Sequence, residues 1–278
     1  MQTNTILNIK SNSRKWKILD ATNIKLIAVV LMFVDHIYQM WAHAGAPMWL
    51  DIFGRPVFPM FLFIAAESFY YTRSKKKYLT HLLFASWGMI IFTTLLERIV
   101  PNKNIVLMNN AFNTFFVSGL YMLFWDWLVE GIRNKSPKKI MKAILLGLIP
   151  ILSALPLFAV GMLASNENVP LFVPQILVLI GMFIPNIMTV EGTYIFVILG
   201  LLYYIFRKHR FVQILILLLL SVILYIGNPV GSIQWLVCLA TIPMALYNGE
   251  RGRGMKNFFY IFYPAHIGLL YLISTFFG

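Results

Sequence analysis

The sequence predicts an all-α fold, a polytopic bundle of transmembrane helices. Of its 278 residues, 59% are hydrophobic and only 12% are charged, which is too apolar for a soluble domain to hide in one core. Apolar runs of roughly 17 to 25 residues, long enough to span a bilayer as helices, recur along the whole chain. A lipid bilayer is therefore the expected solvent and the first expected partner.

Ten apolar segments are expected to be helical. They lie at approximately 21–41, 53–72, 78–98, 111–131, 140–162, 171–188, 193–206, 211–227, 230–247 and 257–277. Segment 171–188 is short and bounded by Pro174 and Pro185, so a re-entrant or surface helix is expected there. About nine full crossings follow in that case. Ten crossings, with both chain ends cytoplasmic, follow if this segment also spans.

The distribution of basic residues predicts how the chain is oriented in the membrane. The net charge of +13 comes from 23 Lys and Arg residues that cluster at segment ends, for example over 73–77 and 133–142. Because basic residues favour the cytoplasmic side, residues 1–18 are expected to form a basic cytoplasmic N-terminal segment. Residues 19–278 would then form a single transmembrane domain. The clustering indicates topology and not nucleic-acid binding.

The first expected helix carries three ionisable side chains at membrane depth. Each costs about 2.5 to 3.5 kcal/mol on insertion scales, so each needs a structural or functional reason. Lys25 and His36 are eleven residues apart, close to three turns, and so share one helix face about 16 Å apart. Asp35 points about 100° away from His36, so we expect it to face a neighbour such as Arg55.

The second expected helix contributes Arg55, Glu67 and Arg73. Running from outside to inside, it places Arg55 at a depth comparable to His36. Arg55 could instead snorkel to the outer interface, and Arg73 could be an ordinary cytoplasmic anchor. Glu67 lies six residues inside the helix end, where a carboxylate has no comparable snorkelling route.

The last expected helix places a proline and a histidine near mid-membrane. Pro264 frees a carbonyl about one turn back, which His266 or Tyr263 could help to order. A buried histidine is often a packing and hydrogen-bonding residue, so a purely structural role stays open. Asn113, on the fourth segment, could likewise serve only as a hydrogen bond between helices.

Other kinds of chemistry have no signature in the sequence. There is no metal-ligand spacing, phosphate-binding loop, dinucleotide fingerprint or serine-nucleophile elbow. Cys238 is the single cysteine, which excludes an internal disulfide and a cysteine-rich metal site. The residues themselves therefore indicate only a histidine-centred membrane site, with no metal.

Several short strings follow one another in a specific order. They are Lys25-Leu26-Ile27-Ala28, Val34-Asp35-His36-Ile37, Gly54-Arg55, Glu67-Ser68-Phe69, Glu191-Gly192, Tyr247 to Gly252 and Phe262-Tyr263-Pro264-Ala265-His266. With them the chain resembles the TraX family, named for conjugative pilin acetylation, from about residue 19 to the end. That family is similar to membrane acyltransferases that carry an acyl group from cytoplasmic acyl-CoA to an acceptor at the other face. The larger group typically has a basic residue and, eleven positions later, a histidine; here these are Lys25 and His36, with Lys replacing the more usual Arg.

The resemblance implies an acetyltransferase of the bacterial cytoplasmic membrane that uses acetyl-CoA as donor. The acceptor would be a surface glycan or polymer hydroxyl, or a secreted peptide amine. His36 would act as general base or form an acyl intermediate, Asp35 would orient it or a neighbour, and Arg55 would hold the acceptor or stabilise charge. The remaining candidates for binding acyl-CoA or acceptor are Lys25, Glu67, Arg73, Asn113, Tyr263 and His266. A transporter or flippase is the main alternative.

Overall fold

The computed structural model describes residues 16–163, 169–170, 172–228 and 231–277, so most of the expected N-terminal segment lies outside the described residues. Its helices are α2 (Ala21–Trp41), η1 (Ala42–Ala44), α3 (Trp49–Ile52), α4 (Val57–Tyr71), α5 (Lys75–Ile99), α6 (Ala111–Arg133), α7 (Pro137–Leu152), α8 (Leu155–Leu163), α9 (Phe172–Phe183), α10 (Thr193–Ile205), α11 (Arg210–Gly227), η2 (Gln234–Ala240), α12 (Thr241–Leu246) and α13 (Lys256–Phe277). Within the described ranges there is no β-strand, only an isolated bridge between Leu19 and Tyr247. The all-α prediction is confirmed.

Among the residues that the structure describes, seven helical stretches are long and apolar enough to cross a membrane, so the chain is a multi-pass membrane protein. They are Ala21–Ala44, Trp49–Tyr71, Lys75–Ile99, Ala111–Arg133, Pro137–Leu163, Arg210–Gly227 and Lys256–Phe277. Three shorter apolar helices, Phe172–Phe183, Thr193–Ile205 and Gln234–Leu246, occupy the remaining expected segments. The twelve residues of α9 extend only about 18 Å, which agrees with the expectation of an incomplete span there.

Two further segments are about as short as α9. The first matches its expected bounds of 193–206, whereas the second is shorter than the expected 230–247. Helix α10 has 13 residues, and the segment from Gln234 begins with seven residues of 3₁₀ helix before six residues of α-helix. Because 3₁₀ runs longer than three or four residues are uncommon, η2 is an unusual backbone in an apolar stretch.

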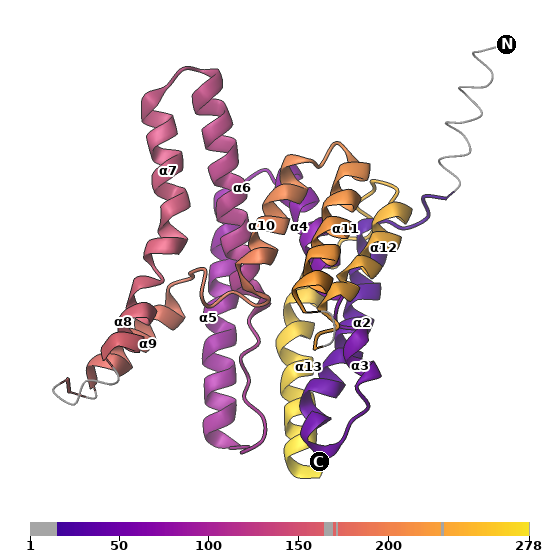
Figure 1. Cartoon of the computed structure of the whole chain (residues 1–278), viewed down its shortest axis with the longest axis vertical. Coiled ribbons are helices and arrows are strands. Elements are labelled where there is room, and N and C mark those ends of the chain that lie inside the picture. The colour runs from indigo at the N-terminus through magenta and orange to yellow at the C-terminus, as the bar shows by residue number, and fades with distance from the viewer. Residues whose placement is uncertain (1–15, 164–168, 171, 229–230, 278) are drawn as a thin grey trace. The chain divides into compact units, whose positions relative to one another are not determined.

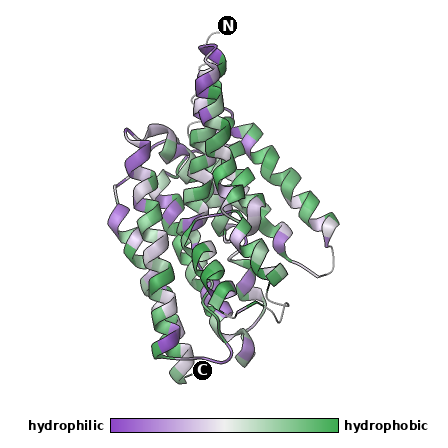
Figure 2. Ribbon diagram, turned by 90° about the vertical axis from the view of Figure 1, so that its left-hand side faces the viewer, coloured by the Kyte–Doolittle hydropathy of each residue, from purple (hydrophilic) through white to green (hydrophobic). Residues whose placement is uncertain are grey.

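Apolar side chains cover the outer faces of several helices, as expected where lipid is the solvent. Leu145 on α7 is 56% exposed and Ile223 on α11 is 65% exposed. Figure 2 shows apolar residues along most of the helical length, with hydrophilic residues concentrated near helix ends. This pattern would be costly in water and is favourable in a bilayer.

The chain divides into two compact units. The first contains residues 1–64 and 206–278, and the second contains residues 65–205, so helix α4 contributes to both. In the first unit, α13 packs beside α2, while α11 packs against η2 and α12 (Figure 1). In the second unit, α6 and α7 form an antiparallel hairpin, and α5 and α10 pack on α6 (Figure 1).

Candidate functional site

The first unit joins the histidines of its first and last helices. Nδ1 of His36 on α2 lies 2.6 Å from Nε2 of His266 on α13. The two rings are nearly parallel, at 11°, with centroids 4.9 Å apart, so they meet edge to edge through these nitrogens. His36 is 4% exposed and His266 is 3% exposed, so both imidazoles lie in a poorly solvated site. Two side chains 230 residues apart therefore form one buried pair.

The backbone determines which nitrogen of each ring carries hydrogen. Nδ1 of His266 lies 2.7 Å from the carbonyl oxygen of Phe262, and a carbonyl can only accept, so this Nδ1–H donates. In a neutral His266, Nε2 is then the acceptor, and Nδ1–H of His36 must be the donor to it. The lone pair of neutral His36 is consequently on Nε2. This is the arrangement of an oriented base: the partner fixes the tautomer and would stabilise the positive charge formed when Nε2 takes a proton.

Aromatic side chains surround His266. The ring of Phe262 stacks on it at 4.7 Å between centroids, and that of Tyr263 is tilted at 5.9 Å. The carbonyl deprived of its helical partner by Pro264 is that of Tyr260, four residues back. His266 instead bonds to Phe262, because an imidazole on the same helix reaches the carbonyl of the preceding turn.

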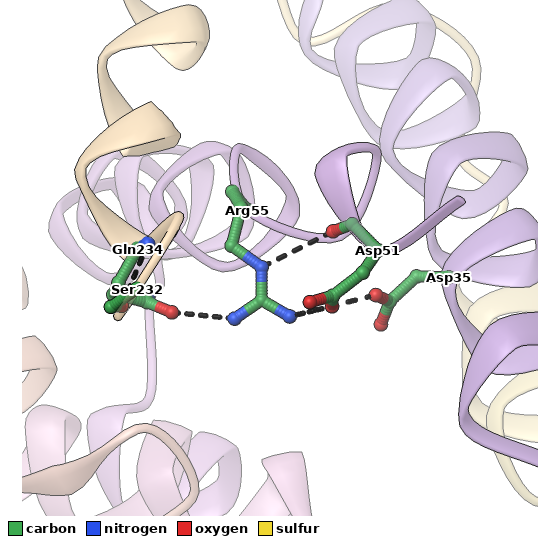
Figure 3. A network of polar contacts seen from close by, with 5 residues as sticks. All are labelled: Asp35, Asp51, Arg55, Ser232 and Gln234. Carbon is green, nitrogen blue, oxygen red and sulfur yellow. Dashed lines mark hydrogen bonds and ion pairs between the residues drawn. The ribbon is translucent and has the colours of Figure 1, made fainter. Parts of the chain in front are cut away.

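Asp35 and Arg55 are neighbours, as the sequence suggested. Nη2 of Arg55 lies 3.9 Å from Oδ1 of Asp35 and also pairs with the carboxylate of Asp51 (Figure 3). Its Nε donates to the backbone oxygen of Asp51 at 3.2 Å, and its Nη1 donates to Oε1 of Gln234 at 2.5 Å. Ser232 accepts from the backbone nitrogen of Gln234 at 3.1 Å. Arg55 thus ties α2, α3 and η2 together.

Gly54 allows the carboxylate of Asp35 to approach the turn before α4. A Cβ built on Gly54 would lie 2.1 Å from Oδ1 of Asp35, a distance that real atoms cannot adopt. The string Gly54-Arg55 therefore has a geometric reason: the glycine makes room for Asp35 and the arginine reaches it.

Lys25 lies three turns before His36 on α2 and is half-buried. Its Nζ is 5.4 Å from the centroid of the Phe259 ring on α13, a cation–π contact. The like charge of Arg251 is within electrostatic reach of it. The same two helices that hold the histidine pair therefore also hold this cation.

Three predicted binding residues belong to the second unit. Glu67 on α4 is half-buried and Arg73 is exposed in the turn before α5. Asn113 on α6 is 2% exposed, and its Nδ2 donates to the backbone and hydroxyl oxygens of Thr189, each at 2.8 Å. Among described residues, Oδ1 of Asn113 has no hydrogen-bond partner. Asn113 does link segments as a structural residue would, and its role in substrate binding remains a prediction.

A second polar cluster, built from Lys75, Asp126 and Tyr204, lies in the second unit. Lys75 forms an ion pair with Asp126, and the hydroxyl of Tyr204 donates to the two carboxylate oxygens at 2.8 and 2.9 Å. The side chain of Asp126 is 28% exposed, and nothing in the sequence indicated that it pairs with Lys75 and Tyr204. Hydropathy carries no signal for such a pairing, because it does not reveal which helices are neighbours.

Sequence reasoning also missed Asp51 and Gln234. Asp51 was outside the apolar segments, and Gln234 was one polar residue in an apolar run. The available signal was Asp51 standing four residues before Arg55, the spacing of an intrahelical ion pair. No group of three or more His, Cys, Asp or Glu side chains that could hold a metal occurs within the part of the chain that the structure describes.

Comparison with known proteins assigns the sequence to a family. Residues 20–274 match the family described as TraX protein, which is nearly the whole chain. The chain belongs to the TraX family. As a TraX protein it is also 24% identical over 267 residues to the "Probable fimbrial assembly protein FimC, serogroup H1" of Dichelobacter nodosus, covering 90% of this chain and 93% of that relative. No solved structure matches the chain.

Proposed function

We propose that this TraX protein is an integral membrane acetyltransferase that moves an acetyl group from cytoplasmic acetyl-CoA to an acceptor on the other side of the membrane. The observation that carries the proposal is the buried His36–His266 pair, whose hydrogen bonds leave the lone pair on Nε2 of His36. A protein that only anchors or scaffolds others has no need of a base oriented in this way. The family's association with pilin acetylation and the fimbrial name of the relative support the same activity.

In the proposed reaction, Nε2 of His36 takes the proton of an acceptor hydroxyl or amine as the acceptor atom attacks the thioester carbonyl. The carbon–sulfur bond then breaks, and coenzyme A leaves as a thiolate that receives the proton from the imidazolium. His266 contributes by accepting the Nδ1–H of His36, which becomes more acidic while His36 is charged. The products are acetylated acceptor and coenzyme A, and no metal or redox partner is required.

Asp35 and Arg55 have the proposed task of receiving the acceptor. Arg55 is held by Asp51 and Gln234, so its guanidinium is oriented before any substrate arrives. Asp35 immediately precedes His36 on α2, so its carboxylate lies on the same helical turn. A surface glycan or polymer hydroxyl and a secreted peptide amine both fit this chemistry.

The experiment compares cells with and without the protein. Mass spectrometry of surface glycans and of exported peptides should reveal an acceptor that loses the mass of one acetyl group when the protein is absent. Restoring wild-type protein should restore the acetyl group, and His36→Ala should not. Acetylation that persists in full with His36→Ala would overturn the proposed role of the histidine.

A membrane transporter is the second candidate, favoured by the three short apolar helices α9, α10 and η2–α12. Short or broken helices mark substrate sites in many transporters, and a histidine pair can carry a proton. The two functions differ in their products: a transporter delivers its substrate unchanged, whereas the transferase releases coenzyme A. Release of free thiol from acetyl-CoA, dependent on the protein, separates them.

A further inference from the structure

The segment between α12 and α13 is clasped onto the start of α2. The backbone nitrogen of Leu19 bonds to the oxygen of Leu246 at 3.1 Å, and that of Asn248 bonds back to the oxygen of Leu19 at 2.8 Å. The nitrogen of Ala21 bonds to the oxygen of Glu250 at 2.9 Å. Residues 247–254, named here the clasp loop, are therefore fixed by main-chain hydrogen bonds to the first helix.

Side chains of α2 continue this attachment along the clasp loop. The hydroxyl of Thr22 donates to the backbone oxygens of Arg251 at 3.1 Å and Arg253 at 2.6 Å. Gly252, between these arginines, has a φ of +69°, and a Cβ there would lie 2.5 Å from the carboxylate of Asp20. The close approach and the left-handed backbone both require glycine. The result is that two arginines are held beside the turn of α2 that carries Lys25.

The cations gathered here are not neutralised by their neighbours. Lys25, Arg251, Arg253 and Lys256 form no ion pair within 4.0 Å with a described acidic residue. Two carboxylates are nearby. Asp20 accepts from the backbone nitrogen of Asn23 at 2.7 Å, and Glu250 accepts from the side chain of Asn248 at 3.3 Å. Four cations against two carboxylates leave an excess of two positive charges around the clasp loop, whose main-chain hydrogen bonds hold it against the start of α2.

We propose that the clasp loop, through Arg251 and Arg253 together with Lys25, binds the phosphate groups of coenzyme A. This inference rests on the proposed acetyl transfer and identifies where the donor is held. Lys25 is half-buried, whereas Arg251 and Arg253 are exposed on a loop whose backbone is fixed. Since none of the three forms an ion pair with a described acidic residue, together they are a suitable site for phosphate oxygens. Lys25 and His36 share a face of α2 about 16 Å apart, which directs the pantetheine arm from the phosphates along the helix towards the histidine pair.

The test is a calorimetric titration of full-length protein in nanodiscs of neutral lipid. The probes are coenzyme A and pantetheine, which has the same thiol arm without phosphates. The double variant Arg251→Gln with Arg253→Gln should bind coenzyme A about ten- to a hundredfold more weakly, the loss expected for about one charged hydrogen bond, because both arginines are exposed and solvent screens their charge. Its affinity for pantetheine should not change, and Arg251→Lys with Arg253→Lys should recover part of the lost affinity.

The matched control removes two exposed cations elsewhere, Arg133→Gln with Lys138→Gln, and should bind coenzyme A like the wild type. Equal binding of coenzyme A by wild type and the clasp-loop variant would overturn this inference and leave the proposed function standing. Equal weakening of both probes would also overturn it, because the loop would then act only on folding. The titrations are repeated in nanodiscs that contain anionic lipid. A clasp-loop variant that differs from the wild type only there would also overturn the inference, because the site would then bind lipid headgroups. Wild-type protein that binds no coenzyme A would refute the proposed function itself.

Discussion

Each of the two units contains a cluster of polar side chains that is at least partly buried. The clusters differ in whether every polar group in them is satisfied by another member. In the second unit, Lys75, Asp126 and Tyr204 satisfy one another: the cation, the carboxylate and the hydroxyl are joined by direct contacts. In the first unit, the hydrogen bonds from Phe262 through His266 to His36 end at a lone pair. We call a cluster closed when its polar groups satisfy one another, and open when one of them keeps an available lone pair. A closed cluster stabilises helix packing, whereas an open cluster provides an atom that can react.

The two units also differ in whether their half-buried lysines are paired with a carboxylate. Lys75 is neutralised by Asp126, while Lys25 lies beside another cation and an aromatic ring. Membrane helices bear the cost of such groups only where they serve packing or chemistry. Variants of the histidine pair should therefore affect activity more than stability, and variants of the Lys75–Asp126–Tyr204 cluster should do the opposite.

The largest effect is expected from His36→Gln. Glutamine fills a similar volume but cannot take a proton, so acetyl transfer should fall about 10²- to 10⁴-fold, the contribution typical of a general base. The melting temperature of the detergent-solubilised protein should stay near that of the wild type. A variant that transfers acetyl groups at the normal rate would remove the distinction between the two clusters.

His266 is expected to position His36, so its effect should be smaller. His266→Phe removes the acceptor of the Nδ1–H of His36 and should lower kcat about 10- to 100-fold, as loss of an orienting partner does elsewhere, with little change in KM. His266→Gln retains an acceptor oxygen and should recover part of the rate. Equal loss in both variants would indicate that His266 serves packing alone.

Acidification should inhibit the enzyme, because only a neutral His36 has a lone pair to accept a proton. As the pH falls below the pKa of His36, kcat/KM should drop about tenfold per pH unit and should level off on the alkaline side. The profile is measured with pure protein after confirming that it stays folded at each pH. A rate that rises as the pH falls would contradict a neutral histidine base.

Gly54→Ala tests the close packing of the Asp35 carboxylate against the turn before α4. The added methyl group would clash with the Asp35 carboxylate, so we expect a loss of about 1 to 3 kcal/mol in stability and a lower kcat. Gly88→Ala is the matched control, because a Cβ on this exposed glycine of α5 meets nothing within 4 Å. Thermal unfolding and acetyl transfer are measured on both variants, and equal behaviour of the pair would contradict the close packing of Asp35.

Tyr204→Phe should produce the smallest change and only in stability. The variant retains the buried ring but loses the hydrogen bonds to Asp126, at a cost of about 1 kcal/mol. Acetyl transfer per folded molecule should be unaltered. A large fall in kcat without a change in melting temperature would assign chemistry to the cluster regarded here as structural.

Much of this architecture could be predicted, because length and hydropathy report directly on membrane spans. All ten expected segments contain helix, and helical periodicity alone placed Lys25 and His36 on one face. The Asp35–Arg55 contact was predicted because both residues were expected at a similar depth in the membrane. Periodicity cannot identify which helix packs against a given face, so the histidine pair and the contact with Gln234 required the structure.

The clasp loop was hidden for a different reason. The string Tyr247 to Gly252 was part of the resemblance to the family. Its hydrogen bonds to Leu19 and Thr22, however, all use backbone atoms of the loop, which any sequence possesses. The 3₁₀ turns of η2 were equally invisible, because an apolar run does not report its helical type. These features depend on long-range packing and not on local propensity.

The most direct test of acetyl transfer supplies radiolabelled acetyl-CoA to inside-out membrane vesicles that contain the protein and its native acceptor. Free thiol release and label in macromolecular material are measured together. We predict that wild-type vesicles release coenzyme A and incorporate label in equal amounts, and that vesicles without the protein do neither. Wild-type vesicles that incorporate no label, although the protein is folded and acetyl-CoA has access, would contradict the account.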